Sequence, residues 1–278
     1  MNKINIYAFA DEASRYIDGQ IEAMKRNGLN GLEIRGVDGS TVTAISLEKA
    51  KEIKKKLDDN GLITWSIGSP IGKINIGDSF DGHIEKFKYL LEMADILDCK
   101  NIRMFSFYMP KDEKPEIYKN EVIDRLGILL DLAKDSGVAV CHENEKGIYG
   151  DIPERCLDLH KALPELKGIF DPANFVQCGA DTLAGWEMLK PYIHYMHIKD
   201  AKIDGTVVPA GYGAGNVQEI AKKFIEAGGR DFTIEPHLAV FDGFAKLEKP
   251  DDNIAEFTFD DSNVAFDTAC NSFKALIK

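Results

Sequence analysis

The sequence predicts an α/β fold, a single (β/α)₈ barrel, from three observations. Short β-rich runs alternate with longer segments of helical period along all 278 residues. There are eight such runs, and their starts lie 25 to 38 residues apart, which suits one strand, one loop and one helix each. No Gly-x-Gly-x-x-Gly follows the first run, and no Ser/Gly-rich linker divides the chain. We therefore expect one domain over residues 1–278, a closed parallel barrel rather than an open doubly wound sheet.

The strand candidates are rich in aliphatic, β-branched and aromatic residues. In order they are INIYAFA from Ile4, GLEIRG from Gly31, ITWSIGS from Ile63, NIRMFSFY from Asn101, VAVCHE from Val138, GIFD from Gly168, IHYMHIKD from Ile193 and DFTIEP from Asp231. Segments with apolar residues at helical spacing separate several of them. These helix candidates are Ser46–Asn60, His83–Leu97, Val122–Ala133, Asn216–Ala227 and Asp260–Leu276. Ser46 is an expected N-cap, and Gly61 an expected helix stop.

Composition narrows the class of protein. The chain is 44% hydrophobic and 29% charged, which is ordinary globular composition. Its formal net charge of −12 argues against nucleic acid or an anionic membrane as a partner. Five cysteines without CxxC spacing argue against a structural zinc site or a disulfide framework. The early Asp11 and Glu12 interrupt any secretory signal, and no stretch approaches the roughly 18 apolar residues of a membrane span, so we expect a cytoplasmic protein.

The last connection is unusually long. It separates Pro236 from Asp260 and contains several aromatic residues. Loops of this length are often lids or interface segments, and a plain surface excursion is the alternative. Self-association into a homo-oligomer is therefore one expected role.

Polar residues stand where four successive strands end. These are Glu143, Asp171, His197 and Glu235, on the fifth to eighth strand candidates. In a (β/α)₈ barrel the active site lies at the carboxyl ends of the strands. Three carboxylates without a cation would repel one another, and one of them would have to hold a proton. The pattern therefore predicts a site for one divalent metal ion, Mn²⁺, Mg²⁺, Co²⁺ or Zn²⁺.

Several segments together resemble one known family. They are DEAS and GLNGLEIRGVDG near the start, GSPIGKI after the third strand, and HEN, FDPAN, HIKD, GYGAGN and TIEP later. Over essentially the whole chain the sequence resembles the sugar phosphate isomerase/epimerase family of the xylose isomerase-like TIM barrels. The resemblance implies that Glu143, Asp171, His197 and Glu235 are the metal ligands, and that Glu143 and Glu235 also transfer protons. The implied activity is isomerisation or epimerisation of a small sugar, sugar phosphate or inosose through an enediolate.

The chain departs from relatives at two positions. Glu145 stands where they often have a histidine two residues after the fifth-strand glutamate. Asn174 stands near the sixth-strand aspartate, where ketose 3-epimerases of this group often have a histidine, which weakens that activity specifically. Asn174 is kept as a candidate substrate contact.

Other polar residues near the expected site have two interpretations. Lys199 should point the same way as His197, either to hold a substrate oxyanion or to pair with a nearby carboxylate. Glu33, Arg35 and Arg103 alternate with apolar residues, which favours a structural network inside the barrel over substrate contacts. His237 lies close enough in sequence to touch substrate.

Two features could serve a phosphate group. GYGAGN, residues 211–216, follows the seventh strand and opens a helix, the usual phosphate position in such barrels. Lys73, in SPIGKI, could pair with an anion or face solvent. His83 and His160 fall on helical segments and are expected at the surface.

Three other functions compete with isomerase or epimerase. A dehydratase of a keto-polyol, of the inosose dehydratase type, would use the same intermediate. A non-catalytic sugar-binding barrel is a second alternative. A phosphodiester endonuclease of related fold is disfavoured, because such sites are rich in histidine and cations, whereas this chain has six histidines and a charge of −12.

Overall fold

The computed structural model describes residues 3–239 and 259–278, and in it eight parallel strands close into a barrel in the order β1-β12-β9-β8-β7-β6-β5-β2. The strands are β1 (Asn5–Ala8), β2 (Gly31–Ile34), β5 (Ile63–Gly68), β6 (Asn101–Met104), β7 (Ala139–Glu143), β8 (Lys167–Phe170), β9 (Ile193–Ile198) and β12 (Asp231–Ile234). Strands β1 and β12 close the barrel, with Ala8 opposite Ile234. The predicted (β/α)₈ barrel and its eight strands are confirmed.

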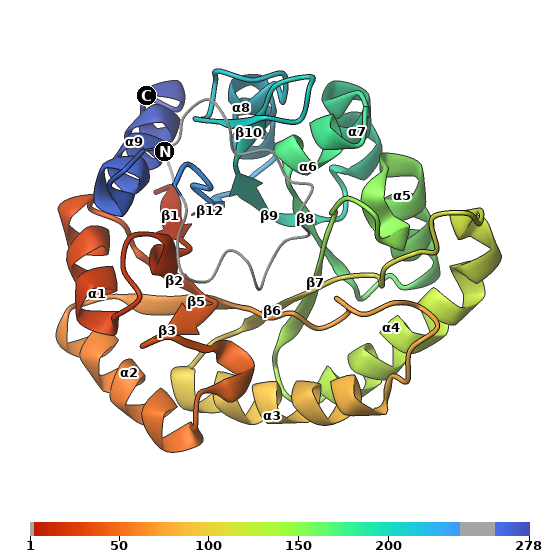
Figure 1. Cartoon of the computed structure of the whole chain (residues 1–278), viewed down its shortest axis with the longest axis horizontal. Coiled ribbons are helices and arrows are strands. Elements are labelled where there is room, and N and C mark those ends of the chain that lie inside the picture. The colour runs from red at the N-terminus through yellow and green to blue at the C-terminus, as the bar shows by residue number, and fades with distance from the viewer. Residues whose placement is uncertain (1–2, 240–258) are drawn as a thin grey trace.

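The helices form a ring around the strands (Figure 1). They are α1 (Ile17–Arg26), α2 (Leu47–Asp59), α3 (Asp81–Leu97), α4 (Lys119–Ala133), α5 (Pro153–Ala162), α6 (Pro172–Gln177), α7 (Thr182–Leu189), α8 (Val217–Glu226) and α9 (Ser262–Leu276). The Ser46 side chain caps α2 by accepting a hydrogen bond from the Lys49 N–H, as predicted. Gly61 ends the same helix with φ +67°.

Two short antiparallel hairpins follow the carboxyl ends of barrel strands β2 and β9. One joins β3 (Gly36–Val37) to β4 (Ser40–Thr41), and the other joins β10 (Asp200–Ala201) to β11 (Val207–Val208). The sequence does not signal either, since each pairs only two residues per strand. The fourth predicted strand also proves too long, because β6 stops at Met104 and the backbone turns at Phe107, which has φ +64°.

Inside the barrel, side chains are stacked in layers along the strands. Tyr7 and Trp65 stack with ring centroids 4.7 Å apart, and Tyr195 meets Trp65 edge-on. Two residues further along β9, His197 occupies the next layer toward the carboxyl end. A layer of aromatic rings therefore lies next to a polar layer inside the barrel. The larger apolar core lies between the strands and the helices.

Some expectations from the sequence need correction or stay untested. His83 and His160 are 7% and 2% exposed, not surface residues, because each ring is held by a backbone group, Gly72 N–H and Leu166 C=O respectively. Residues 240–258 of the long final connection lie outside the described part of the chain, so its lid or interface role is untested. No helix in residues 3–239 and 259–278 is both long and apolar enough to cross a membrane.

Candidate functional site

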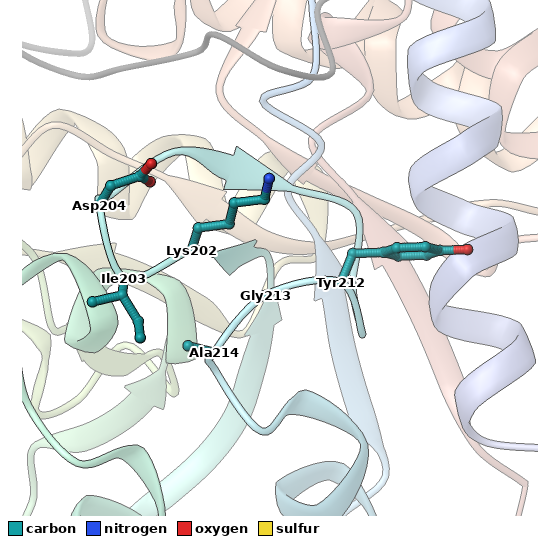
Figure 2. Close-up of a pocket in the computed structure, with 6 residues that line it drawn as sticks. All are labelled: Lys202, Ile203, Asp204, Tyr212, Gly213 and Ala214. Atoms are coloured by element: carbon teal, nitrogen blue, oxygen red, sulfur yellow. The ribbon is translucent and has the colours of Figure 1, made fainter.

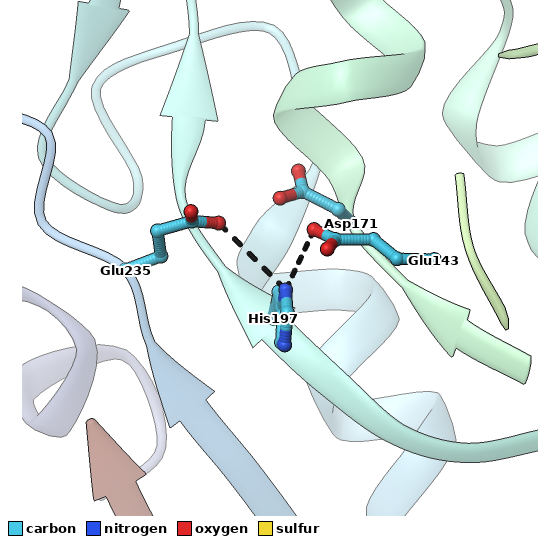
Figure 3. Close-up of side chains that lie close together, drawn as sticks. All are labelled: Glu143, Asp171, His197 and Glu235. Atoms are coloured by element: carbon cyan, nitrogen blue, oxygen red, sulfur yellow. Dashed lines mark hydrogen bonds and ion pairs between the residues drawn. The ribbon is translucent and has the colours of Figure 1, made fainter. Parts of the chain in front are cut away.

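The four residues predicted at the strand ends come together at the mouth of the barrel. Glu143 is the last residue of β7, Asp171 caps α6 directly after β8, His197 is in β9, and Glu235 follows β12. One ligand atom from each lies within 4.8 Å of those from the other three. All four are buried, between 0% and 4% exposed. Figure 3 shows Glu235 and Glu143 approaching the same end of the His197 ring, one from the left and one from the right.

His197 contacts both glutamates of the cluster through one ring nitrogen. Its Nδ1 lies 2.7 Å from Glu143 Oε1 and 3.7 Å from Glu235 Oε2. Its Nε2 lies 3.0 Å from Glu33 Oε2. Burial alone would lower the pKa of His197, but the two facing carboxylates, Glu143 and Glu33, raise it to about 10. Both ring nitrogens therefore face an acceptor, and the ring is a cation among these acids.

The carboxylates differ in charge state. Burial opposes ionisation of Glu143, but His197 and Arg103 lower its pKa below the usual value. Burial is likewise outweighed at Glu235, where Lys199 above all holds the pKa well below its usual range. At Asp171 burial prevails over Lys199 and raises the pKa to about 7. Glu143 and Glu235 are thus ionised at neutral pH, whereas the third acid, Asp171, titrates near neutral pH, chiefly because it is buried.

These residues fit a divalent cation. Three carboxylates and one imidazole are the donors that Mn²⁺, Zn²⁺ and related ions accept. Asp171 Oδ2 is buried and accepts no hydrogen bond within the described residues, although Lys199 Nζ lies 3.4 Å away. Its other oxygen, Oδ1, accepts the Asn174 N–H at 3.0 Å and so fixes the orientation of the carboxylate. An oriented carboxylate oxygen with spare capacity beside two ionised acids is what a cation site needs.

The predicted substrate contacts are all near this cluster, and each already has protein partners. Lys199 Nζ lies 3.2 Å from Glu235 Oε2, so it pairs with the cluster itself. Arg35 contacts Asp11, Glu12 and, at 3.5 Å, Glu235. Arg103 contacts Glu143 at 3.1 Å. The polar network expected inside the barrel is present, and it holds the two glutamates in place.

Three other predicted contacts lie around the rim of the cluster. His237 Nε2 is 3.2 Å from Glu235 Oε1. Lys73 Nζ is 2.8 Å from Glu145 Oε2. Asn174 donates from its side chain to the Asn144 backbone carbonyl at 2.8 Å, so that amide group ties the first turn of α6 to the end of β7.

The family of the chain follows from a sequence comparison. Residues 21–255 match the family model described as xylose isomerase-like TIM barrel. The chain belongs to the xylose isomerase-like TIM barrel family. The resemblance inferred from the sequence motifs is thereby confirmed at the level of the family.

Relatives of this xylose isomerase-like barrel include enzymes of different reaction types. A 3-dehydroshikimate dehydratase of Bacillus anthracis is 23% identical over 176 residues, 63% of this chain, and the match spans 62% of the length of that relative. The crystal structure of the probable 3-DHS dehydratase AsbF of Bacillus anthracis has a TM-score of 0.74 at 19% identity, covering 99% of both chains. The TM-score and the coverage show that the AsbF structure and this chain share a fold.

Two further solved structures have the same barrel. The IOLI protein with a bound zinc atom has a TM-score of 0.74 at 16% identity, covering 99% of this chain and 98% of that one. A D-tagatose 3-epimerase-like protein has a TM-score of 0.73 at 15% identity, with the same coverage. One protein with this fold thus contains a bound zinc atom.

Sequence reasoning missed Glu12 in this xylose isomerase-like barrel. Glu12 is 4% exposed, accepts the His237 N–H at 2.6 Å, and pairs with Arg35 at 2.9 Å. Burial, followed by the nearby acids Glu235 and Asp11, raises its pKa to about 8, although Arg35 opposes this. The sequence does contain a signal for Glu12, because an acidic pair directly follows the first predicted strand, at the end of the barrel where active sites lie. Glu12 joins His237 and Glu235 in a second buried group of potential ligands.

Proposed function

We propose that this chain is a divalent-metal-dependent isomerase or epimerase of a small sugar or polyol, with Glu143 and Glu235 as its proton-transfer pair. The supporting observation is the placement of these two carboxylates, which come from different strand ends and lie 2.7 and 3.7 Å from the same His197 nitrogen (Figure 3). They come from β7 and from the segment after β12, so a substrate held between them would meet a carboxylate on two sides. Epimerisation needs that arrangement, because the proton leaves one face of the carbon and returns to the other.

The proposed ligands of the cation are Glu143, Asp171, His197 and Glu235. When bound, a divalent cation supplies charge compensation for the oxygen of an enediolate. The remaining work falls to side chains of the chain. Glu143 and Glu235 are ionised at neutral pH, so each can accept a proton from the substrate carbon.

The cationic neighbours position these acids. Arg103 holds Glu143, while Lys199 and Arg35 hold Glu235. Lys199 is only 6% exposed and lies between Glu235 and Asp171, where its ammonium group can also donate to a substrate oxygen. In this proposal Lys199, His237 and Glu12 line the substrate side of Glu235.

The proposal is tested by hydrogen exchange. Purified protein is incubated in D₂O with ketoses, aldoses and inososes, with and without added Mn²⁺ or Mg²⁺, and deuterium incorporation is followed by NMR. We expect metal-dependent exchange with at least one compound. Glu235→Gln should lower the exchange rate by about 100-fold or more, the usual scale of a lost general acid–base group, while some metal binding is retained.

Glu219→Gln is the matched control, because Glu219 lies on α8 and its side chain is 54% exposed. This variant should exchange at the rate of the unmodified protein. Exchange that survives Glu235→Gln would show that the two-glutamate mechanism is wrong. If no compound exchanges although elemental analysis finds bound metal, a non-catalytic sugar-binding barrel is the better description.

A dehydratase is the second candidate, favoured by the sequence match to a 3-dehydroshikimate dehydratase. Elimination of water would start from the same proton abstraction and differ in the fate of the intermediate. The same incubations, extended to 3-dehydroshikimate, separate the two by mass spectrometry. A product lighter by one water indicates the dehydratase, and deuterium uptake without loss of water indicates the isomerase or epimerase.

A further inference from the structure

The glycine-rich loop expected to bind phosphate already holds an anion of the chain itself. The Asp200 carboxylate accepts hydrogen bonds from the N–H groups of Ala201 at 2.9 Å, Gly211 and Gly213 at 3.0 Å, and Gly215 at 2.9 Å. Asp200 is 1% exposed. A cluster of converging N–H groups before a helix is the usual cradle for a phosphate. Here the cradle before α8 is filled by a carboxylate.

The glycines in this loop make room for Asp200. A Cβ atom at Gly213 would collide with Asp200 Oδ1 and with the Ala201 carbonyl oxygen. One at Gly215 would lie 2.7 Å from Asp200 Oδ1. Gly211 has φ +90°, a conformation that side chains with a Cβ rarely adopt. The glycine pattern that resembled a phosphate site is therefore explained by an internal contact.

The lysines expected near the site face carboxylates as well. Lys73 pairs with Glu145 at 2.8 Å and lies 4.4 Å from the centre of the Phe105 ring. Lys199 pairs with Glu235 and Asp171. A phosphate dianion approaching either lysine would meet an acidic group at the same point, and such like-charge contacts are unfavourable.

The outer side of the loop offers no better cradle. There a shallow depression of about 520 Å³ is lined by Lys202, Ile203, Asp204, Tyr212, Gly213 and Ala214 (Figure 2). Its lining contains one cation and one anion, Lys202 and Asp204. Ile203 and Tyr212, which are 88% and 67% exposed, make much of the rest apolar.

We propose that the substrate of this barrel is an unphosphorylated sugar or polyol, because Asp200 closes the phosphate cradle and Glu145 covers Lys73. This proposal names the substrate class of the proposed enzyme and therefore rests on the proposed function. The closure of the cradle is a separate property, which can be measured without any reaction.

The first test compares free ketoses with their phosphate esters in the D₂O exchange assay. The free sugar of at least one pair should exchange about tenfold faster or more at equal concentration, a difference of about 1.4 kcal/mol. Equal or faster exchange of the phosphorylated members would overturn the proposal. If neither member of any pair exchanges, the proposed function fails. The second test alone then decides whether Asp200 closes the phosphate cradle.

The second test measures binding of inorganic phosphate to chelator-treated protein by ³¹P NMR and calorimetry. Unmodified protein should show no saturable binding with Kd below about 1 mM. Asp200→Gly, which removes the carboxylate and leaves the N–H groups, should gain such binding, whereas Asp204→Gly on the same hairpin should not. Saturable binding to unmodified protein, or no gain in a variant shown by circular dichroism to be folded, would contradict the closure. If Asp200→Gly does not fold, the result with unmodified protein decides.

Discussion

At the scale of single residues, the hydrogen bonds of His197 say most about the chemistry of the site. Its two ring nitrogens have different partners, Glu143 at Nδ1 and Glu33 at Nε2. Glu33 is itself held by Tyr195 Oη at 3.1 Å and Ser66 Oγ at 3.2 Å, both donating to Oε1. Glu33 therefore lies behind the cluster, where its carboxylate can accept the Nε2 proton and leave Nδ1 for a cation. This is the arrangement by which outer carboxylates orient metal-binding histidines.

Glu33→Gln is expected to weaken metal binding by about 10- to 100-fold, because the amide accepts the Nε2 proton less strongly and can present its NH₂ group instead. Calorimetric titration with Mn²⁺ or Zn²⁺ measures the affinity, and ¹⁵N NMR of the His197 ring reports which nitrogen carries the proton. Glu22→Gln, at an exposed position of α1, is the control. Unchanged affinity in Glu33→Gln would leave Glu33 with a purely structural role.

At the scale of elements, the site is made by strand ends and the turns that follow them. Asp171 illustrates this, because the same carboxylate that faces the cluster also caps α6 through the Asn174 N–H. Asp200, just after β9, holds the loop before α8 in a similar way, because its carboxylate accepts hydrogen bonds from the Gly211 and Gly215 N–H groups. The start of α6 and the loop before α8 are thus each held by a buried acid at the mouth of the barrel.

Gly213→Ala should destabilise the protein by about 1–3 kcal/mol, because the added methyl group overpacks the contact with Asp200 and Ala201. Gly82→Ala is the matched control. Gly82 lies in α3 with nothing within 4 Å of an added Cβ, so the same substitution should stabilise by about 0.5–1 kcal/mol. Urea unfolding measures both. A neutral or stabilising Gly213→Ala would mean that the loop does not depend on the Asp200 cradle.

At the scale of the whole molecule, the acidic residues behind the net charge of −12 fall into an exposed group and a buried group. Many of the acidic residues lie on exposed helix faces, as Glu22 of α1 and Glu92 of α3 do. A smaller part is buried at the barrel mouth, where Glu143, Asp171 and Glu235 surround His197. Ionisation at the mouth is therefore coupled to the stability of the entire fold.

Chelator-treated protein is expected to lose stability as the pH rises from 7 to 9. His197 has its pKa raised from 6.5 to about 10, so in this window the folded protein keeps a proton that the unfolded chain releases. Glu12, with its pKa raised to about 8, acts in the same direction. Urea unfolding at pH 7, 8 and 9 measures the slope. His197→Gln should flatten the profile, and a stability that rises through this window would contradict the assignment.

Added Zn²⁺ should stabilise the protein more at pH 8 than at pH 6.5. A coordinated imidazole must be neutral, so metal and proton compete for His197. The shift in thermal midpoint with and without the ion measures this effect. A shift that does not grow with pH would argue that His197 is not a ligand.

The sequence by itself determined the barrel and the four polar residues that stand near the ends of its last four strands. Strand and helix periodicities are local properties, and the eight candidates correspond to β1, β2, β5, β6, β7, β8, β9 and β12. Because parallel strands bring their carboxyl ends to one edge, the meeting of Glu143, Asp171, His197 and Glu235 could be predicted without coordinates. That residues 1–278 form one domain stays a prediction, as do the chemical roles of these side chains.

Only the tertiary structure decided which partner each polar group takes. Glu33 and His197 are 164 positions apart along the chain, yet they form a hydrogen bond of 3.0 Å. Glu12 reaches His237 across the closing seam of the barrel, and Asp200 fills a loop that otherwise looks like a phosphate site. Such pairings depend on three-dimensional distance and on desolvation. Neither is encoded in local spacing, so residue patterns located the site but could not say how its charges are balanced.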